Sequence, residues 1–519
     1  MKTTRRAKKA LCLLTALLML LPVFAACSES KENTDGEKAG TDAPAVSSDN
    51  TAPEETEEET EPDPFAGRSY NGRSFRVSSS TNDAESTLVS SNYLIEGPEE
   101  LVGDAAPDEA FQRNKRVEEL LDISLEFTGV NYGYGDVGNY IRHFVTTADD
   151  AYDCFINDIY GTTSLTVEGA FHNGLDFENF DFSKPWWYED FMRDISFNYQ
   201  YQFALAGDFF IDVLRSSHIL ILNKSLYADI YGNPDEMYDI VLAGDWTYDR
   251  MCAMIEEVYS DLNGNQKADG DDRYAYVCYQ IWGPMIPHLI SADPGFVERD
   301  EQGYPTFTVY NERTLKLIDY LEVLFMGPYC GVQDVFQGGT SADMNFATGK
   351  SLFIGSQRLG SLEHSTFRDM EYDIGVVPYP TMEPGGKYIT SAHDTSEVGL
   401  IPVTVPLDDF DFVSAAIEVL NRETNKTVLP VYYESSLKLK YTRDQMSARM
   451  IDIIHDNIGN SFPLAWSNQF DGMLLFKIYE AIVDNGGDYA SYYKRAEKAQ
   501  TKILAKMIEK FEKNNHVGE

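Results

Sequence analysis

Gly244-Asp-Trp-Thr-Tyr-Asp249 leads through a short apolar-periodic segment into Asp261-Leu-Asn-Gly-Asn-Gln-Lys-Ala-Asp-Gly-Asp-Asp272. Between the two quoted stretches, apolar residues recur at three- and four-residue spacing, which predicts an amphipathic helix over residues 248–259. Thr247 can cap the start of this helix with its hydroxyl. The chain is therefore predicted to form a helix, then a polar loop, and then a strand over residues 274–279.

The polar loop carries oxygen ligands at the spacing of a calcium-binding loop. Its first, third, fifth, seventh, ninth and twelfth positions are Asp261, Asn263, Asn265, Lys267, Asp269 and Asp272, with Lys267 offering its backbone carbonyl. Two positions depart from the pattern, because Gln266 replaces the usual glycine and Asp272 is shorter than the usual glutamate. We predict a structural Ca²⁺ here, and the alternative is a solvated acidic turn.

The same stretch resembles extracellular solute-binding proteins of carbohydrate ABC transporters, in the lipoprotein form found in Gram-positive bacteria. Further segments that resemble this family follow in the expected order, namely residues 111–120, 181–187, 223–227, 346–350, 372–378 and 431–454. The resemblance covers about residues 73–515. It implies a two-lobed, periplasmic-binding-protein-like type II α/β fold, in which each lobe is a mixed sheet flanked by helices and the C-terminal part is helical.

The first residues have the features of an export signal. A basic start precedes the apolar run Ala10 to Val23, which is shorter than the roughly 20 apolar residues of a membrane span. Phe24-Ala-Ala-Cys27 then resembles a lipobox, so we predict lipidation of Cys27. The alternative is ordinary cleavage after an Ala-x-Ala-like site, with Cys27 as an incidental thiol.

Residues 28–64 contain 13 acidic and 2 basic residues and almost no large apolar side chains. Such a composition cannot bury enough surface to offset the chain entropy, so the segment is predicted to be disordered and extended by charge repulsion. It suits a tether that holds a folded body away from a membrane. A solvated tail without that role would show the same composition.

The remaining chain begins with alternating strand and helix patterns. Strands are expected around Phe75, at residues 123–127 and at 152–156, with helices between them. This β-α-β-α-β order predicts a parallel sheet with right-handed crossovers. Ligands of such sheets sit beyond the carboxyl ends of the strands, which makes Asp158 and Tyr160 candidate ligand contacts.

We expect the following organisation along the chain. The ranges are 1–26 signal peptide, 27–64 acidic tether, 65–205 first part of lobe 1, 206–340 first part of lobe 2, 341–400 return to lobe 1, and 401–519 lobe 2 with C-terminal helices. Four cysteines lie in the body, and their spacing fits no disulfide framework. Cys154 and Cys252 fall in apolar patterns and are expected to be buried thiols.

Charge and motifs exclude several classes of function. The formal net charge of −42 argues against nucleic acid and anionic lipid as partners. The sequence has no G-x-S-x-G elbow, H-E-x-x-H pair, P-loop or dinucleotide fingerprint. With 84 carboxylates, some pair will lie at a glycosidase-like separation by chance. We therefore expect a protein that is not an enzyme.

Aromatic residues make up 13% of the chain, including 32 tyrosines. A sugar site needs aromatic plates for the apolar faces of the ring and polar side chains for its hydroxyls. Trp282, which follows the strand after the acidic loop, and Trp466 are candidate stacking platforms. Arg358 and Asp394 are candidate hydroxyl partners, and any of the four could instead be a core or surface residue.

Together, the residues and the resemblance predict a lipid-anchored, monomeric receptor on the extracellular face of a bacterial membrane. It would capture a carbohydrate between two lobes, close around it, and deliver it to the permease of an ABC transporter. Two alternatives remain open. One is a secreted glycoside hydrolase or lyase, and the other is a surface adhesin without ligand-induced closure.

Overall fold

The computed structural model describes residues 62–81, 91–131, 136–335, 337–368, 370–434, 445–470, 474–484 and 487–515. The signal, Cys27 and nearly all of the tether lie outside these ranges, so their assignments stay predictions. No helix in the described ranges combines the length and the apolar character needed to cross a bilayer.

A first five-stranded sheet has the order β2-β1-β3-β13-β4. Its strands are β1 (Arg73–Ser80), β2 (Ile123–Val130), β3 (Cys154–Asp158), β4 (Ala204–Leu205) and β13 (Glu397–Leu400). β1 runs parallel to β2 and β3, whereas β13 is antiparallel to β3 and β4. The strands and helices predicted for residues 73–156 are confirmed. The register opposes Glu397 to Asp158, so two carboxyl side chains meet where β3 ends.

A second five-stranded sheet has the order β11-β5-β10-β6-β9. Its strands are β5 (His218–Asn223), β6 (Tyr274–Cys278), β9 (Gly331–Val332), β10 (Ser351–Arg358) and β11 (Ile374–Val377). β6 runs parallel to β9 and β10, while β5 is antiparallel to β10. β11 is also antiparallel to β5, so the carboxyl ends of β6, β9, β10 and β11 and the start of β5 share one edge of this sheet, where Arg358 pairs with His218.

The prediction that residues 341–400 return to the first lobe is wrong for most of that range. β10 and β11 hydrogen-bond to β5 in the second sheet, and only β13 joins the first. The chain instead crosses into the second sheet after β4 and crosses back just before β13. The hydrophobic pattern identified these strands but could not say which sheet would pair with them, because pairing is a long-range property.

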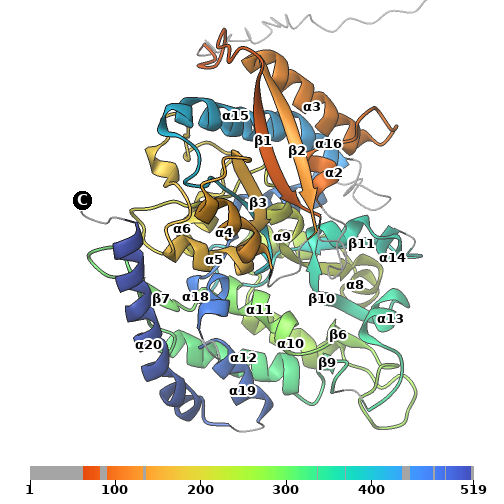
Figure 1. Ribbon diagram of the computed structural model, residues 1–519. Helices are drawn as coiled ribbons and strands as arrows, with labels where there is room; N and C mark the ends of the chain where they lie inside the picture. Colours follow the sequence, from red (N-terminus) through yellow and green to blue (C-terminus); the bar gives the residue numbers. More distant parts are fainter. Residues whose placement is uncertain are drawn as a thin grey trace, which may run out of the picture. The chain divides into compact units, whose positions relative to one another are not determined.

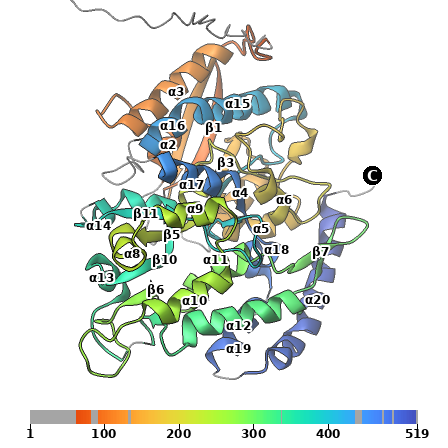
Figure 2. The ribbon, with the colours of Figure 1, turned by 180° about the vertical axis from the view of Figure 1, so that it is seen from behind.

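Helices cover both sheets (Figures 1 and 2). In chain order they are α2 (Asn92–Ile95), α3 (Ala105–Leu121), α4 (Val137–Thr147), α5 (Ile159–Val167), α6 (Glu189–Ile195), α7 (Asp212–Arg215), α8 (Lys224–Tyr231), α9 (Glu236–Leu242), α10 (Tyr248–Val258), α11 (Trp282–Ser291), α12 (Glu312–Met326), α13 (Ala342–Ala347) and α14 (Ser365–Arg368). The predicted cap at Thr247 is confirmed, since its hydroxyl accepts from Arg250 N, and Asn223 caps α8 by accepting from Leu226 N.

After β13 the described chain is mostly helical, as predicted. The elements are α15 (Phe410–Glu423), α16 (Leu429–Tyr432), α17 (Gln445–Asp456), the short strand β14 (Ile458–Gly459), α18 (Phe462–Ala465), α19 (Phe476–Val483) and α20 (Tyr489–Asn514). Three further short strands, β7 (Val297–Arg299), β8 (Pro305–Phe307) and β12 (Thr390–Ser391), precede β13. These helices do not all belong to the second lobe, because α15 packs on α3 and α20 on α5, while α17 packs on β11. The body cysteines Cys154, Cys252, Cys278 and Cys330 are free thiols; Cys154 is buried as expected, whereas Cys252 is only partly buried.

Candidate functional site

A cavity of about 740 Å³ lies at the shared edge of the second sheet. The strands position its lining: His218 starts β5, Tyr279 follows β6, Gln333 follows β9, and Arg358 ends β10. Helix α13, the 3-10 helix η2 (Leu359–Glu363) and the segment between β12 and β13 complete the wall. This is the location at which open α/β sheets place their ligands.

Arg358 and Asp394, both predicted from sequence, line this cavity together. Asp394 Oδ1 lies 3.0 Å from Nδ1 of His393, and the Asp394 side chain keeps 24% of its surface exposed. Burial alone would raise the pKa of Asp394, but the hydrogen bond from His393 and the charges of His393 and Arg358 lower it. The wall therefore presents an ionised acceptor beside a cationic donor.

His218 adds a neutral acceptor to the same wall. Burial, together with the nearby charges of His393 and Arg358, lowers the pKa of His218 to about 3. Its Nδ1 lies 2.9 Å from the backbone oxygen of Ser391. Because a carbonyl can only accept, Nδ1 carries the proton and Nε2 is left with a lone pair. The ring centroid of His393 is 5.6 Å from that of His218.

The first sheet contributes an acidic edge near the cavity. Burial raises the pKa of Asp158 to about 6. The hydrogen bond from the amide of Gly161 lowers this pKa, whereas the charges of Asp394 and Asp212 raise it. Burial and the charges of Asp212 and Asp158 also raise the pKa of Glu397 well above its ordinary range. Asp158 caps α5, accepting from Gly161 N at 2.6 Å. Asp394 lies three residues before Glu397, which pairs with Asp158, so this wall of the cavity adjoins the first sheet.

The two tryptophans predicted as stacking platforms lie in different surroundings. Trp466 is only 2% exposed, stacks on Phe462 at 5.4 Å and donates to the carbonyl of Ile195. It is a core residue, so its prediction as a sugar platform is wrong. Trp282 is half-buried against Phe476 and Tyr479 of α19, although its neighbour Gly283 lines the cavity. Tyr160 lies in the first turn of α5 and is not among the lining residues.

Several residues that line the cavity were not predicted from the sequence. His218 and His393 carry no sequence motif that marks them as ligand contacts, whereas Tyr279 and Gln333 directly follow strands. The rule that ligands lie beyond the carboxyl ends of strands would have found Tyr279 and Gln333. Tyr279 is 43% exposed, which is unusual for a large aromatic residue at the end of a buried strand. No sequence signal would have paired His218 with His393, which are far apart in the chain.

The loop at residues 261–272 has the backbone that a cation loop requires. Gln266, at the position usually occupied by glycine, adopts a positive φ of 62°. Asp261 accepts from the amides of Gly264 and Gln266 at 2.7 and 2.8 Å, and Asp269 accepts from the side chains of Asn263 and Asn265. These hydrogen bonds tie the side chains of the loop to its own amide groups, and no cluster of three or more His, Cys, Asp or Glu side chains within the described residues could hold a metal ion.

No protein-family model and no curated protein sequence matches this chain. Among solved structures, an ABC transporter solute-binding protein from Thermotoga lettingae bound to α-D-tagatose is similar, with 11% identity, a TM-score of 0.49, and coverage of 83% of this chain and 100% of that one. UgpB from Mycobacterium tuberculosis in complex with glycerophosphocholine has 14% identity, a TM-score of 0.49, and coverage of 84% and 99%.

An ABC substrate-binding protein from Listeria monocytogenes in complex with cycloalternan is also similar. It shares 11% identity with a TM-score of 0.48, and the match covers 84% of this chain and 99% of that one. These similarities concern the arrangement of helices and strands. The function of this chain therefore has to be inferred from the side chains of its own cavity.

Proposed function

We propose that this chain is the substrate-binding component of an ABC importer, which captures a neutral carbohydrate between two lobes and delivers it to a membrane permease. The observation that carries the proposal is the 740 Å³ cavity at the strand ends. Its volume lies in the range of roughly 300–1,000 Å³ that small-molecule sites occupy. Its lining combines polar side chains with apolar ones.

The chemistry of the lining suits hydroxyl groups. Arg358 is a fixed donor, Asp394 is an ionised acceptor, and His218 offers a neutral acceptor. A sugar hydroxyl both donates and accepts, so it can satisfy each of these groups. Phe346 and Phe367 in the same lining can pack against the apolar face of a ring. Asp343 and Asp394 add negative charge that disfavours an anionic ligand.

Closure would follow from contacts on both sides of the cavity. A ligand favours the closed state only if it binds that state better than the open one. The second sheet supplies Arg358 and His218, whereas Asp394 precedes a strand of the first sheet. A bound sugar that bridges these residues would make such closed-state contacts. We also keep Trp282 as a candidate platform, because the adjacent Gly283 lines the cavity.

We further propose that lipid on Cys27 anchors a monomer to the extracellular face of the membrane. Two or more acyl chains are needed for stable anchoring, since one chain binds only marginally. Cys27→Ser should move the protein from the membrane fraction to the medium. Mass spectrometry that finds an unmodified Cys27 at the mature N-terminus would contradict the anchor and leave the binding function untouched.

The functional proposal is tested by calorimetry against a panel of neutral glycans, combined with small-angle scattering with and without the ligand. We expect one class of glycan to bind with 1:1 stoichiometry and to reduce the radius of gyration. Release of shorter products from an oligosaccharide would indicate a carbohydrate-active enzyme instead. Glycan binding without any change in scattering would favour an adhesin. Binding of peptides with no response to sugars would overturn the substrate class.

A further inference from the structure

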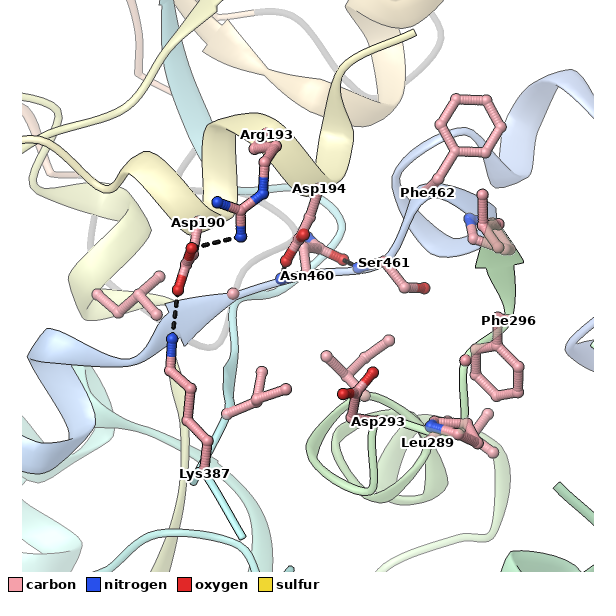
Figure 3. A pocket seen from close by; sticks show the side chains of 18 of the residues that line it. Asp190, Arg193, Asp194, Leu289, Asp293, Phe296, Lys387, Asn460, Ser461 and Phe462 are labelled. Carbon is pink, nitrogen blue, oxygen red and sulfur yellow. Dashed lines mark hydrogen bonds and ion pairs between the residues drawn. The ribbon is translucent and has the colours of Figure 1, made fainter. Parts of the chain in front are cut away.

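A second cavity, of about 260 Å³, is bounded by different elements (Figure 3). Helix α6 forms one wall, with Asp190, Arg193 and Asp194. The end of α11 and strand β7 face it, and β14 with the start of α18 closes the side. No residue of this lining belongs to the lining of the first cavity. The shared helix α11 contributes Ile286 to the first cavity and Leu289 and Ile290 to the second.

The charges of the second cavity balance. Its lining holds the three carboxylates Asp190, Asp194 and Asp293 and the three cations Arg193, Arg299 and Lys387. Asp190 is paired with both Arg193 and Lys387. The guanidinium of Arg299 is directed to the backbone oxygens of Ser196 and Phe197, at 2.8 and 3.0 Å. A charged ligand would upset this balance, so the lining favours a neutral one.

Unsatisfied donors point to a missing partner. Asn460 is 6% exposed, and its Oδ1 accepts from the amide of Ser461 at 2.7 Å. Its Nδ2 has no hydrogen-bond partner among the described residues, and neither have Ser461 Oγ and Arg299 Nε. Leaving a buried donor unpaired costs roughly 1–3 kcal/mol, so such a cluster is rare unless a ligand or water satisfies it.

Acceptors face these donors across the cavity. In Figure 3, Asp194 and Asn460 lie on one wall, and Asp293 approaches from the other. Burial raises the pKa of Asp194 to about 7, and in its ionised form the carboxylate accepts from a hydroxyl. Phe296 and Phe462 add two aromatic faces at the far end of the cavity. Donors, acceptors and aromatic faces together match a compact molecule that carries several hydroxyls.

We propose that the second cavity is a separate binding site for one small neutral polyol, about the size of a single sugar ring. The volume equals that of roughly nine waters at about 30 Å³ each, which is too small for an oligosaccharide. Hydroxyls of the ligand accept from Asn460 Nδ2 and donate to Asp194 and Asp293. Because the lining draws on α6, α11 and the β12–β14 pair, an occupant joins segments that adjoin both sheets.

The test uses ligand-observed NMR titration of the full-length protein with three probes: D-glucose, D-mannitol and myo-inositol. The titrations are made in the Arg358→Met background, which impairs the first cavity, and in the wild type. Asp293→Asn is the key variant, because Asp293 is exposed and asparagine tolerates its φ of 41°. Asp319→Asn, on the exposed face of α12, is the matched control. Asn460→Leu removes the buried amide as a second variant.

We expect at least one probe to bind the Arg358→Met protein saturably. Asp293→Asn and Asn460→Leu should each weaken this binding about tenfold or more, and Asp319→Asn should leave it unchanged. Saturable binding that Asp293→Asn does not alter would overturn the second site. So would the absence of saturable binding in the Arg358→Met background, even if the wild type still bound sugars through the first cavity. A first cavity that binds no glycan, with the second still occupied, would overturn only the proposed transport function.

Discussion

Two arginine–carboxylate groups of the second sheet region differ in their surroundings, because one is enclosed in the core and the other lines a cavity. Arg215 is fully buried and donates from Nε and Nη2 to Glu363, each at 3.0 Å. Tyr93 and Tyr432 donate to the same carboxylate at 3.0 and 2.6 Å. Arg358 and Asp394, in contrast, line an open cavity of about 740 Å³.

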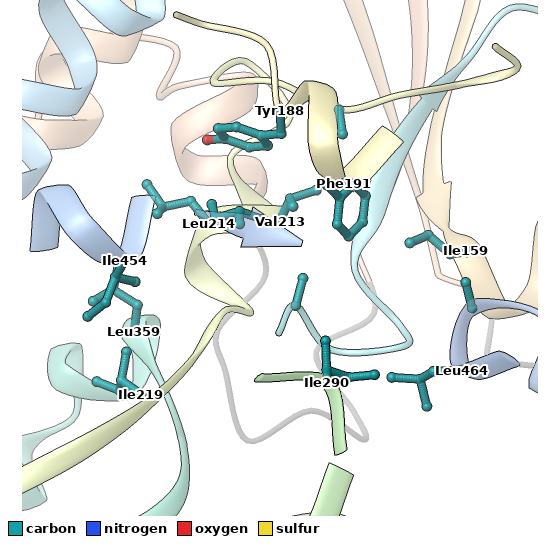
Figure 4. Close-up of a cluster of buried hydrophobic side chains, with 14 of the residues drawn as sticks. Ile159, Tyr188, Phe191, Val213, Leu214, Ile219, Ile290, Leu359, Ile454 and Leu464 are labelled. Carbon is teal, nitrogen blue, oxygen red and sulfur yellow. The ribbon is translucent and has the colours of Figure 1, made fainter. Parts of the chain in front are cut away.

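The surroundings explain the difference. Val213 and Leu214 flank Arg215 in α7 and pack with Leu359 in a buried apolar cluster (Figure 4). An ion pair in such a setting is stable only when every hydrogen-bonding position is filled. The enclosed ion pair therefore stabilises the fold without ligand, whereas the residues that line the cavity are placed where a ligand can contact them. Mutations in the first should change stability, and mutations in the second should change affinity.

The largest expected effect is on stability and follows from removing Arg215 from its ion pair with Glu363. Arg215→Met leaves Glu363 as a buried carboxylate without its cation, which should lower the free energy of unfolding by about 3–5 kcal/mol. Urea denaturation followed by tryptophan fluorescence measures this change. Lys184→Met is the control, because Lys184 and Asp181 are 48% and 49% exposed and such pairs contribute at most about 1 kcal/mol. Equal effects of the two variants on the free energy of unfolding would contradict a special role of the buried Arg215–Glu363 pair.

The acidic loop at residues 261–272 is a predicted calcium site outside the cavity. If Asp261 and its neighbours hold Ca²⁺, the ion stabilises the fold by mass action, by about 2.7 kcal/mol at a concentration one hundred times the Kd. We expect calcium to raise the Tm of the wild type and Asp261→Ala to abolish the increment. Scanning calorimetry with calcium and with chelator, at matched ionic strength, makes the comparison. Identical melting in both conditions would favour a plain acidic turn.

A smaller effect is expected from the pH dependence of stability at a second buried group, in which His455 pairs with Asp208 and Asp456. Nε2 of His455 lies 3.1 Å from the buried carboxylate of Asp208, and Nδ1 lies 2.9 Å from Asp456. Burial opposes the charged form, but the hydrogen bonds to Asp208 and Asp456 prevail and raise the pKa of His455 to about 10.

Because the folded-state pKa exceeds the ordinary value near 6.5, the stabilisation is complete below about pH 6.5 and is lost as the pH rises through about 10. His455→Gln should therefore lower stability at pH 6 by about 1–3 kcal/mol and have little effect above pH 10. Denaturation curves of both proteins at several pH values give the difference. A constant difference across this range would show that the histidine is not charged in the native state.

The fold was predictable where a pattern is local. Alternating apolar residues in β1 and β2, the helical spacing in α10 and the cap at Thr247 depend on neighbours in sequence. The sheet to which β10 and β11 belong is decided by distant pairing with β5, which no local pattern encodes.

The site shows the same limit. Arg358 could be proposed because it ends a strand, and the carboxyl ends of strands have a known role. The prediction for Trp466 was wrong because the sequence does not show whether a tryptophan lies in the core or in a cleft. His218 was missed because its partner His393 comes from another crossing of the chain.

The most direct measurement is the affinity of the Arg358→Met protein for the glycan that binds the wild type, measured by calorimetry beside its Tm. Arg358 lines the cavity as a charged donor, and such hydrogen bonds contribute about 1.5–3 kcal/mol. We predict that the affinity falls about ten- to a hundredfold while the Tm stays within a few degrees of that of the wild type. Unchanged affinity in a folded Arg358→Met protein would contradict the assignment of this cavity as the carbohydrate site.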